Sequence, residues 1–228
     1  MRGYFRDRHA AGVELVGRLT NYRDVARLLV LALPRGGVPV AYEVARSLNA
    51  ELDVMVVRKL GMPLQPELAI GAIASGGACV LNEGLIRASG LTRAHIDAIV
   101  RVERAELERR ELTYRGDRAP LDVRGRVVIL VDDGLATGAS MRAAVVALRS
   151  LHPSKIVVAV PVAPEETADE FVGVVDDFVC VEAARDFNSV GWWYRDFNQV
   201  EDAEVRALLD SIHGREKPSR TQARANSV

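Results

Sequence analysis

Four short runs of branched aliphatic residues constrain the fold of this 228-residue chain more than any other feature. They are Leu28–Leu33, Leu52–Val57, Val127–Val131 and Ile156–Val160. Runs that are this short and almost continuously apolar are typical of strands covered on both faces. A fifth run, Phe178–Val181, is expected to add another strand.

Two of these runs lead directly into a tight turn and a stretch of helical period. Pro34–Gly37 follows the first run, with a helix expected up to Leu48. Asp132–Gly138 follows the third, with a helix expected up to Leu151. Strand, turn and helix in this order build parallel sheets. We therefore predict an α/β fold with a doubly wound, mostly parallel central sheet, which binds ligands at the carboxyl ends of its strands.

The segment between the second and third runs does not read as one short crossover. Leu60–Glu67 contains two prolines and a glycine and is expected to form an irregular loop. Gly76 and Gly77 separate two short apolar runs and predict a hairpin. Thr92–Arg115 reads as a long, charged and largely solvated helix that is capped by Thr92.

Composition narrows the classes of function. The chain has 30 Lys and Arg residues against 31 Asp and Glu residues, so its net charge is close to zero. It therefore has no overall positive electrostatic field that would hold nucleic acid. Cys79 and Cys180 lack a CxxC spacing and are expected to be buried, reduced thiols. The four histidines show no metal-ligand spacing. The polar N-terminus and the lack of an apolar run of about 20 residues favour a cytoplasmic protein with no membrane partner.

We expect residues 1–213 to form a single domain. Residues 214–228 are polar and net positive and show no apolar period, which predicts a disordered tail.

The turn after the third run has the features of a site for a sugar phosphate. Asp132 and Asp133 end the strand, and Ala136–Ser140 is a loop of small and hydroxyl residues that opens a helix. Backbone amides at a helix N-terminus bind phosphate. The two carboxylates repel phosphate and are better suited to hydroxyls or a divalent cation. A turn whose two Asp side chains are merely solvated is the alternative.

This segment resembles the phosphoribosyl-pyrophosphate (PRPP) motif of the type I phosphoribosyltransferases. The resemblance implies that Asp132 and Asp133 contact the ribose hydroxyls. It also implies Mg²⁺ as cofactor, held through PRPP, with the same two acids as candidates for direct ligands. Gly134 departs from the pattern, since the family usually has an aliphatic residue there. The residues expected to wrap the 5′-phosphate are Ala136, Thr137, Gly138, Ala139 and Ser140.

Two further segments are similar to elements of that family. Arg35, Gly36 and Gly37 resemble its pyrophosphate loop, although a Gly-rich turn with a solvent-facing Arg is the alternative. Arg58 and Lys59 resemble the start of its flexible catalytic loop, whose basic residues reach the pyrophosphate. The alternative is that they are ordinary cations at the end of a strand.

The resemblance covers roughly Leu28–Val181 and is nearest to a bacterial stand-alone group with an unassigned base acceptor. It implies a homodimer and a flexible-loop hairpin. It also implies a small hood that is formed by residues 182–200 together with the N-terminus. Glu67 of the loop is a candidate for proton transfer. Ala136 stands where 6-oxopurine enzymes carry an acid, which disfavours hypoxanthine and guanine.

The hood contains an aromatic cluster that could bind a base. The candidates are Trp192, Trp193 and Tyr194 for stacking, and Asp186 or Asn188 for the base edge. A packed satellite core or a dimer contact is the alternative for these aromatics. The expected function is Mg²⁺-dependent transfer of a 5-phosphoribosyl group from PRPP to a nitrogenous base, or the reverse. A PRPP-sensing regulator without transferase activity and, less favoured, a hydrolase are the rivals.

Overall fold

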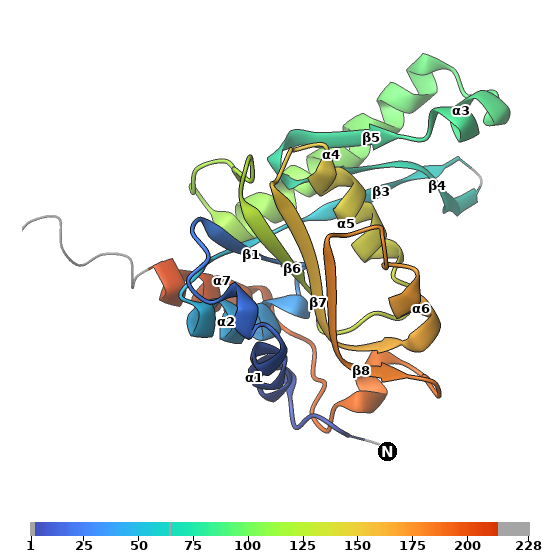
Figure 1. Ribbon diagram of the computed structural model, residues 1–228. Coiled ribbons are helices and arrows are strands. Elements are labelled where there is room, and N and C mark those ends of the chain that lie inside the picture. The colour runs from blue at the N-terminus through green and yellow to red at the C-terminus, as the bar shows by residue number, and fades with distance from the viewer. Residues whose placement is uncertain (1–2, 64, 214–228) are drawn as a thin grey trace, which may run out of the picture.

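The computed structural model describes residues 3–63 and 65–213, with the side chains of Pro66 and Glu67 excepted. Its centre is a parallel sheet of five strands (Figure 1). The strand order β2-β1-β6-β7-β8 confirms the predicted α/β class. The strands are β1 (Leu28–Ala32), β2 (Glu51–Val54), β6 (Val127–Val131), β7 (Lys155–Pro164) and β8 (Asp177–Ala184).

Helices cover both faces of this sheet, as a doubly wound fold requires (Figure 1). Side chains alternate between the faces of a strand, so each strand contributes to two cores. Val30 and Ala32 of β1 join the core under α1, α2 and α7, whereas Leu29 and Leu31 join the core under α5. The helices are α1 (Arg8–Arg18), α2 (Gly37–Leu48), α5 (Ala139–Arg149), α6 (Glu165–Asp169) and α7 (Asp202–His213).

A separate antiparallel sheet carries the predicted hairpin. It consists of β3 (Val57–Met62), β4 (Gln65–Ala74) and β5 (Ala78–Leu81). Helices α3 (Glu83–Ser89) and α4 (Arg93–Arg115) lie beside this sheet (Figure 1). The Thr92 side chain accepts a hydrogen bond from the amide of His95, which confirms the cap, and most of α4 is exposed.

Two local predictions were wrong. The run Leu52–Val57 is not one strand: the Met55 amide still bonds to β1, but the Val56 amide donates to Ser75 Oγ of the hairpin. The chain therefore changes sheets at this point. The second error is Leu60–Glu67, where β3 extends to Met62 and β4 begins at Gln65 in place of an irregular loop, with the strand register shifting on both sides of Gly61.

The prediction of two buried thiols holds only in part. Both cysteines are free, but Cys79 is exposed because it lies on β5, an edge strand with one uncovered face. Cys180 is partly buried, and burial raises the pKa of its thiol to about 11. Within residues 3–63 and 65–213, no helix is long and apolar enough to cross a membrane. The tail predicted over residues 214–228 lies outside the described residues.

Candidate functional site

The loops after β1 and β6 meet because these two strands are parallel neighbours in the sheet. The approach is close enough to require glycine. A Cβ atom on Gly36 would lie 2.1 Å from Asp133 Oδ2, and one on Gly37 would lie 2.7 Å from the carbonyl oxygen of Val131. The peptide bond between Pro34 and Arg35 is cis. The structure thus joins two of the sequence-predicted segments at the carboxyl edge of the sheet.

The two acids sit in an unfavourable electrostatic environment. Asp132 Oδ1 accepts a hydrogen bond from the Asp133 amide at 2.8 Å, and the Asp133 side chain is only 14% exposed. Burial, followed by the charge of Asp133, raises the pKa of Asp132 well above its usual value. Burial also raises the pKa of Asp133, against the opposing effect of Arg8. Two adjacent carboxylates with this little solvent are suited to a ligand that supplies hydroxyls or positive charge.

Arg8 is the cation that reaches this pair. Its Nε donates to Asp133 Oδ2 at 2.8 Å, and its Nη1 donates to the carbonyl of Asn198 at 2.7 Å. Its guanidinium carbon lies 3.9 Å from the centre of the Phe197 ring. Sequence reasoning placed Arg8 only in the N-terminal segment that was a candidate for the hood, because nothing in a single sequence links it to a residue 125 positions away.

The small-residue loop lies at the N-terminus of α5. Gly138 has a φ of 65°, and Ala136, Thr137 and Ser140 are exposed. Arg142 Nη2 donates to the carbonyl of Thr137 at 2.6 Å, and Thr167 Oγ1 donates to the carbonyl of Ala136 at 3.0 Å. Both bonds occupy carbonyl oxygens, so they do not compete with an anion for the amides of the first helical turn.

Arg35 stands at the edge of the same site. Its Nη1 lies 3.6 Å from Asp202 Oδ1, at the start of α7, and one third of its side chain is exposed. The structure therefore adds the start of α7 to the site, which the sequence did not indicate.

The basic pair of the predicted flexible loop is placed on the other sheet. Arg58, on β3, pairs with Glu103 of α4, with 2.7 Å between Nε and Oε2. Lys59 is exposed. Within the described part of the chain, the ion pair of Arg58 is with this acid and not with a residue of the loops after β1 and β6. The side chain of Glu67 lies outside the described atoms.

The predicted hood forms where the N-terminal segment pairs with the segment around Tyr194. Phe5 bridges to Tyr194, and the Gly3 amide donates to the carbonyl of Trp192. Tyr194 donates its hydroxyl to the carbonyl of Asp133 and is buried together with Trp193. Burial and the charge of Asp133 raise the pKa of Tyr194. The hood is thus hydrogen-bonded directly to the backbone of one of the two acids.

The aromatic residues of the hood divide into two groups. Trp193 is packed in the core of the hood, as the satellite-core alternative expects. Trp192 is 39% exposed and lines a cavity of about 610 Å³ together with Tyr194 and Phe197. Asp186 is exposed and follows β8.

The hood also explains the glycine that departs from the expected pattern. A Cβ atom on Gly134 would lie 2.7 Å from Val190 Cγ1 and 3.0 Å from Val162 Cγ1. An aliphatic residue at position 134 therefore requires a different packing of Val190.

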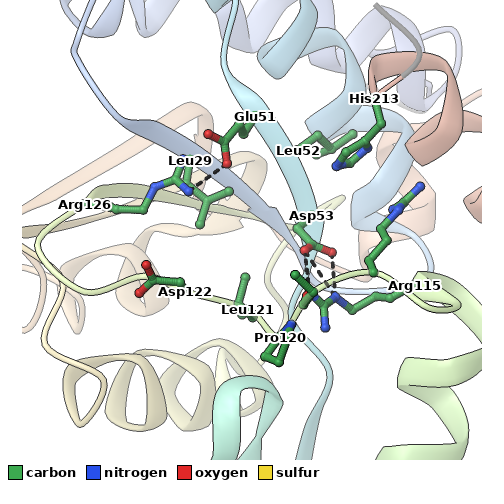
Figure 2. A pocket seen from close by; sticks show the side chains of 12 residues that line it. Leu29, Glu51, Leu52, Asp53, Arg115, Pro120, Leu121, Asp122, Arg126 and His213 are labelled. Atoms are coloured by element: carbon green, nitrogen blue, oxygen red, sulfur yellow. Dashed lines mark hydrogen bonds and ion pairs between the residues drawn. The ribbon is translucent and has the colours of Figure 1, made fainter. Parts of the chain in front are cut away.

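A second cavity, of about 320 Å³, lies at the opposite edge of the sheet, where β1 and β2 begin (Figure 2). Arg115 pairs with Asp53 there, and Arg126 pairs with Glu51. These four charges are already paired with one another in the structure. No sequence-predicted site residue is among the described residues that line it.

Comparison with known proteins identifies the family. A family model described as a phosphoribosyl transferase domain matches residues 13–195. The chain belongs to this phosphoribosyl transferase family. Two proteins from Mycobacterium tuberculosis strains CDC 1551 and H37Rv, both named as putative phosphoribosyl transferases, are 47% identical over 209 residues. These matches cover 92% of this chain and 47% of each relative, so the chain spans about half the length of these curated relatives.

A solved structure supports the same placement. The crystal structure of TT1426 from Thermus thermophilus matches with a TM-score of 0.82 and 42% sequence identity. The match covers 92% of this chain and 98% of the other. The resemblance to the type I phosphoribosyltransferases is therefore confirmed at the level of family and fold. The loops after β1 and β6 lie inside the region that the phosphoribosyl transferase model matches, whereas Arg8 and Asp202 lie outside it.

Proposed function

We propose that this phosphoribosyl transferase family member transfers a 5-phosphoribosyl group from PRPP to a nitrogenous base and releases pyrophosphate. The observation that carries the proposal is the contact between the Gly36 turn and Asp133. It unites a diol-binding acidic pair, an anion-binding helix N-terminus and a second loop with a partly exposed arginine at one edge of the sheet. One ligand that needs all three elements is a ribose with a phosphate at one end and a pyrophosphate at the other.

Each element has a role in this proposal. Asp132 and Asp133 accept hydrogen bonds from the ribose hydroxyls. The residues of the loop Ala136–Ser140 bind the 5′-phosphate through amides and hydroxyls. Gly36 and Gly37 allow the backbone to approach the pyrophosphate, and Arg35 supplies charge-assisted donors to it.

The reaction breaks the bond between ribose C1′ and a pyrophosphate oxygen and forms a bond from C1′ to a ring nitrogen of the base. Positive charge develops on the sugar, so the nearby carboxylates stabilise the transition state. The acidic pair fits Mg²⁺, which typically takes one or two carboxylates and completes its shell with substrate phosphates and water. Mg²⁺ would neutralise charge on the leaving pyrophosphate.

The hairpin residues act in this proposal when the loop closes. Arg58 leaves its ion pair with Glu103 and binds the pyrophosphate instead. Lys59, on the same strand, also binds the pyrophosphate. Glu67 is the candidate for proton transfer. Closure excludes the water that would otherwise hydrolyse the activated sugar.

The acceptor binds in the cavity of the hood, which is lined by Tyr194, the residue that donates a hydrogen bond to the carbonyl of Asp133. Trp192 stacks on the base there, and Asp186 remains a candidate for its edge. Trp193 is a weaker candidate because its side chain is buried. Ala136 disfavours hypoxanthine and guanine on the family pattern. A homodimer is also expected on the resemblance.

A base panel tests this proposal. Pyrophosphate release would be measured with PRPP, Mg²⁺ and one purine, pyrimidine or pyridine base at a time, beside a control without base. Release that depends on one base establishes the transferase and identifies its acceptor. PRPP binding without release for any base would contradict it in favour of a sensor, and release without any base would point to a hydrolase.

A further inference from the structure

Arg8 joins three segments that are far apart in the chain. It extends from the first turn of α1, bonds to Asp133 after β6, and bonds to the carbonyl of Asn198 before α7. The Phe197 ring covers the face of the guanidinium. A planar guanidinium held by two directional bonds and an aromatic face has little rotational freedom.

The carboxylate of Asp133 is correspondingly fixed. Arg8 approaches Oδ2, and the same oxygen faces the Gly36 backbone closely enough to exclude a Cβ atom. Without Arg8, a carboxylate beside Asp132 would turn away from its neighbour, because like charges repel. The opposing charge of Arg8 thus offsets the repulsion where the ribose is expected.

We propose that Arg8 is a positioning residue that orients the Asp133 carboxylate for a ribose diol, an inference that rests on the proposed function. Arg8 does not touch the reacting atoms; it acts through Asp133. It lies outside the region 13–195 that the family model matches, so the family assignment does not provide this role.

Arg6 provides a matched comparison two residues away. Its side chain is 76% exposed and pairs with Asp7, whereas the Arg8 side chain is 11% exposed and pairs with Asp133. A substitution at Arg6 therefore removes an arginine from the same segment and leaves the acidic pair untouched.

The test measures two affinities of the full-length chain by calorimetry in the presence of Mg²⁺, one for PRPP and one for inorganic pyrophosphate. PRPP needs both the ribose and the pyrophosphate contacts, whereas pyrophosphate alone has no ribose diol for the Asp133 carboxylate to bind. We expect Arg8→Met to weaken PRPP binding about tenfold, the effect of losing a hydrogen bond between charged groups. Pyrophosphate affinity should stay within about twofold, and Arg6→Met should leave both affinities unchanged.

Arg8→Lys distinguishes positioning from general damage. A lysine retains the charge and one donor but cannot hold Asp133 and Asn198 with a planar fork, so PRPP affinity should recover only part of the loss. If Arg8→Met does not fold, Arg8→Lys must show the selective loss of PRPP affinity by itself.

The test distinguishes a failure of the role of Arg8 from a failure of the proposed function. Unchanged PRPP affinity in Arg8→Met, or an equal loss of both affinities in the folded variants, would overturn the role of Arg8. Failure of the wild-type chain to bind PRPP would overturn the proposed function and this inference together.

Discussion

Asp132 is the residue at which binding and stability are in conflict. Its pKa is raised in the folded chain by burial and by Asp133, relative to an ordinary value of 3.8. The folded chain therefore binds the proton more tightly than the unfolded chain. The stability gained from a protonated Asp132 is complete below pH 3.8 and is lost as the pH rises through the folded pKa.

Because folding raises the pKa of Asp132, we predict that Asp132→Asn stabilises the ligand-free chain at neutral pH. The substitution removes a buried charge that repels Asp133. We expect a gain on the order of 1 kcal/mol at about pH 7 that shrinks towards about pH 4. Urea unfolding of both chains at several pH values measures it. A difference in the free energy of unfolding that stays constant across this pH range would contradict the role given to the buried charge of Asp132.

At the scale of single residues, local pattern revealed only part of the site. Asp132, Asp133 and Gly36 lie in turns directly after strands, so a single sequence is enough to select them. Arg8 and Asp202 carry no such pattern, because they reach the site only when the ends of the chain fold over the sheet. The periodicity of a sequence does not predict tertiary contacts of this kind.

Among the structural elements, the turn after β1 makes the sharpest prediction. Gly36 has φ −58° and ψ −35°, which alanine adopts readily, so the consequence of Gly36→Ala comes from the contact with Asp133 alone. We expect PRPP affinity to fall by more than about tenfold, since the carboxylate must move. Calorimetric titration with PRPP measures the change.

Gly17→Ala in α1 is the control, because a Cβ atom there meets nothing within 4 Å. This variant should be more stable by about 0.5–1 kcal/mol and bind PRPP normally. Equal PRPP affinities for the Gly36 and Gly17 variants would show that the turn does not depend on close contact with Asp133.

The hairpin element makes a prediction through the ion pair between Arg58 and Glu103. Glu103→Gln weakens the pair and frees Arg58 for pyrophosphate, so the KM for PRPP should fall by up to about threefold. Glu106→Gln is the matched control on the same helix, because Glu106 pairs with Arg109 and Arg110. Steady-state kinetics decides: a KM that responds equally to both substitutions, or rises in Glu103→Gln, speaks against a role for Arg58.

The elements themselves were mostly predictable. Aliphatic runs followed by turns placed β1, β6, α2 and α5 correctly, since each strand is buried and each helix begins at a glycine-rich turn. The break after β2 escaped prediction because it depends on the bond from Val56 to Ser75, across the hairpin. A hydrogen bond between distant residues can divide an apolar run that looks uniform.

For the whole molecule, the site depends on the association of two segments that are far apart in the chain. The N-terminal segment pairs with the segment around Tyr194, and Tyr194 bonds to the carbonyl of Asp133. A ligand that binds the acidic pair would therefore bind at a residue to which the hood is hydrogen-bonded. By mass action, such a ligand stabilises the folded chain in proportion to the logarithm of its concentration.

The most direct test of PRPP binding at the acidic pair is a calorimetric titration of the wild-type chain and of Asp133→Asn with PRPP and Mg²⁺. The asparagine keeps the shape of the side chain but loses the charged acceptor for a ribose hydroxyl. We predict binding by the wild type, and at least about tenfold weaker binding by Asp133→Asn with little change in thermal stability. Equal PRPP affinity in the two chains, or no binding by either, would contradict the proposed site.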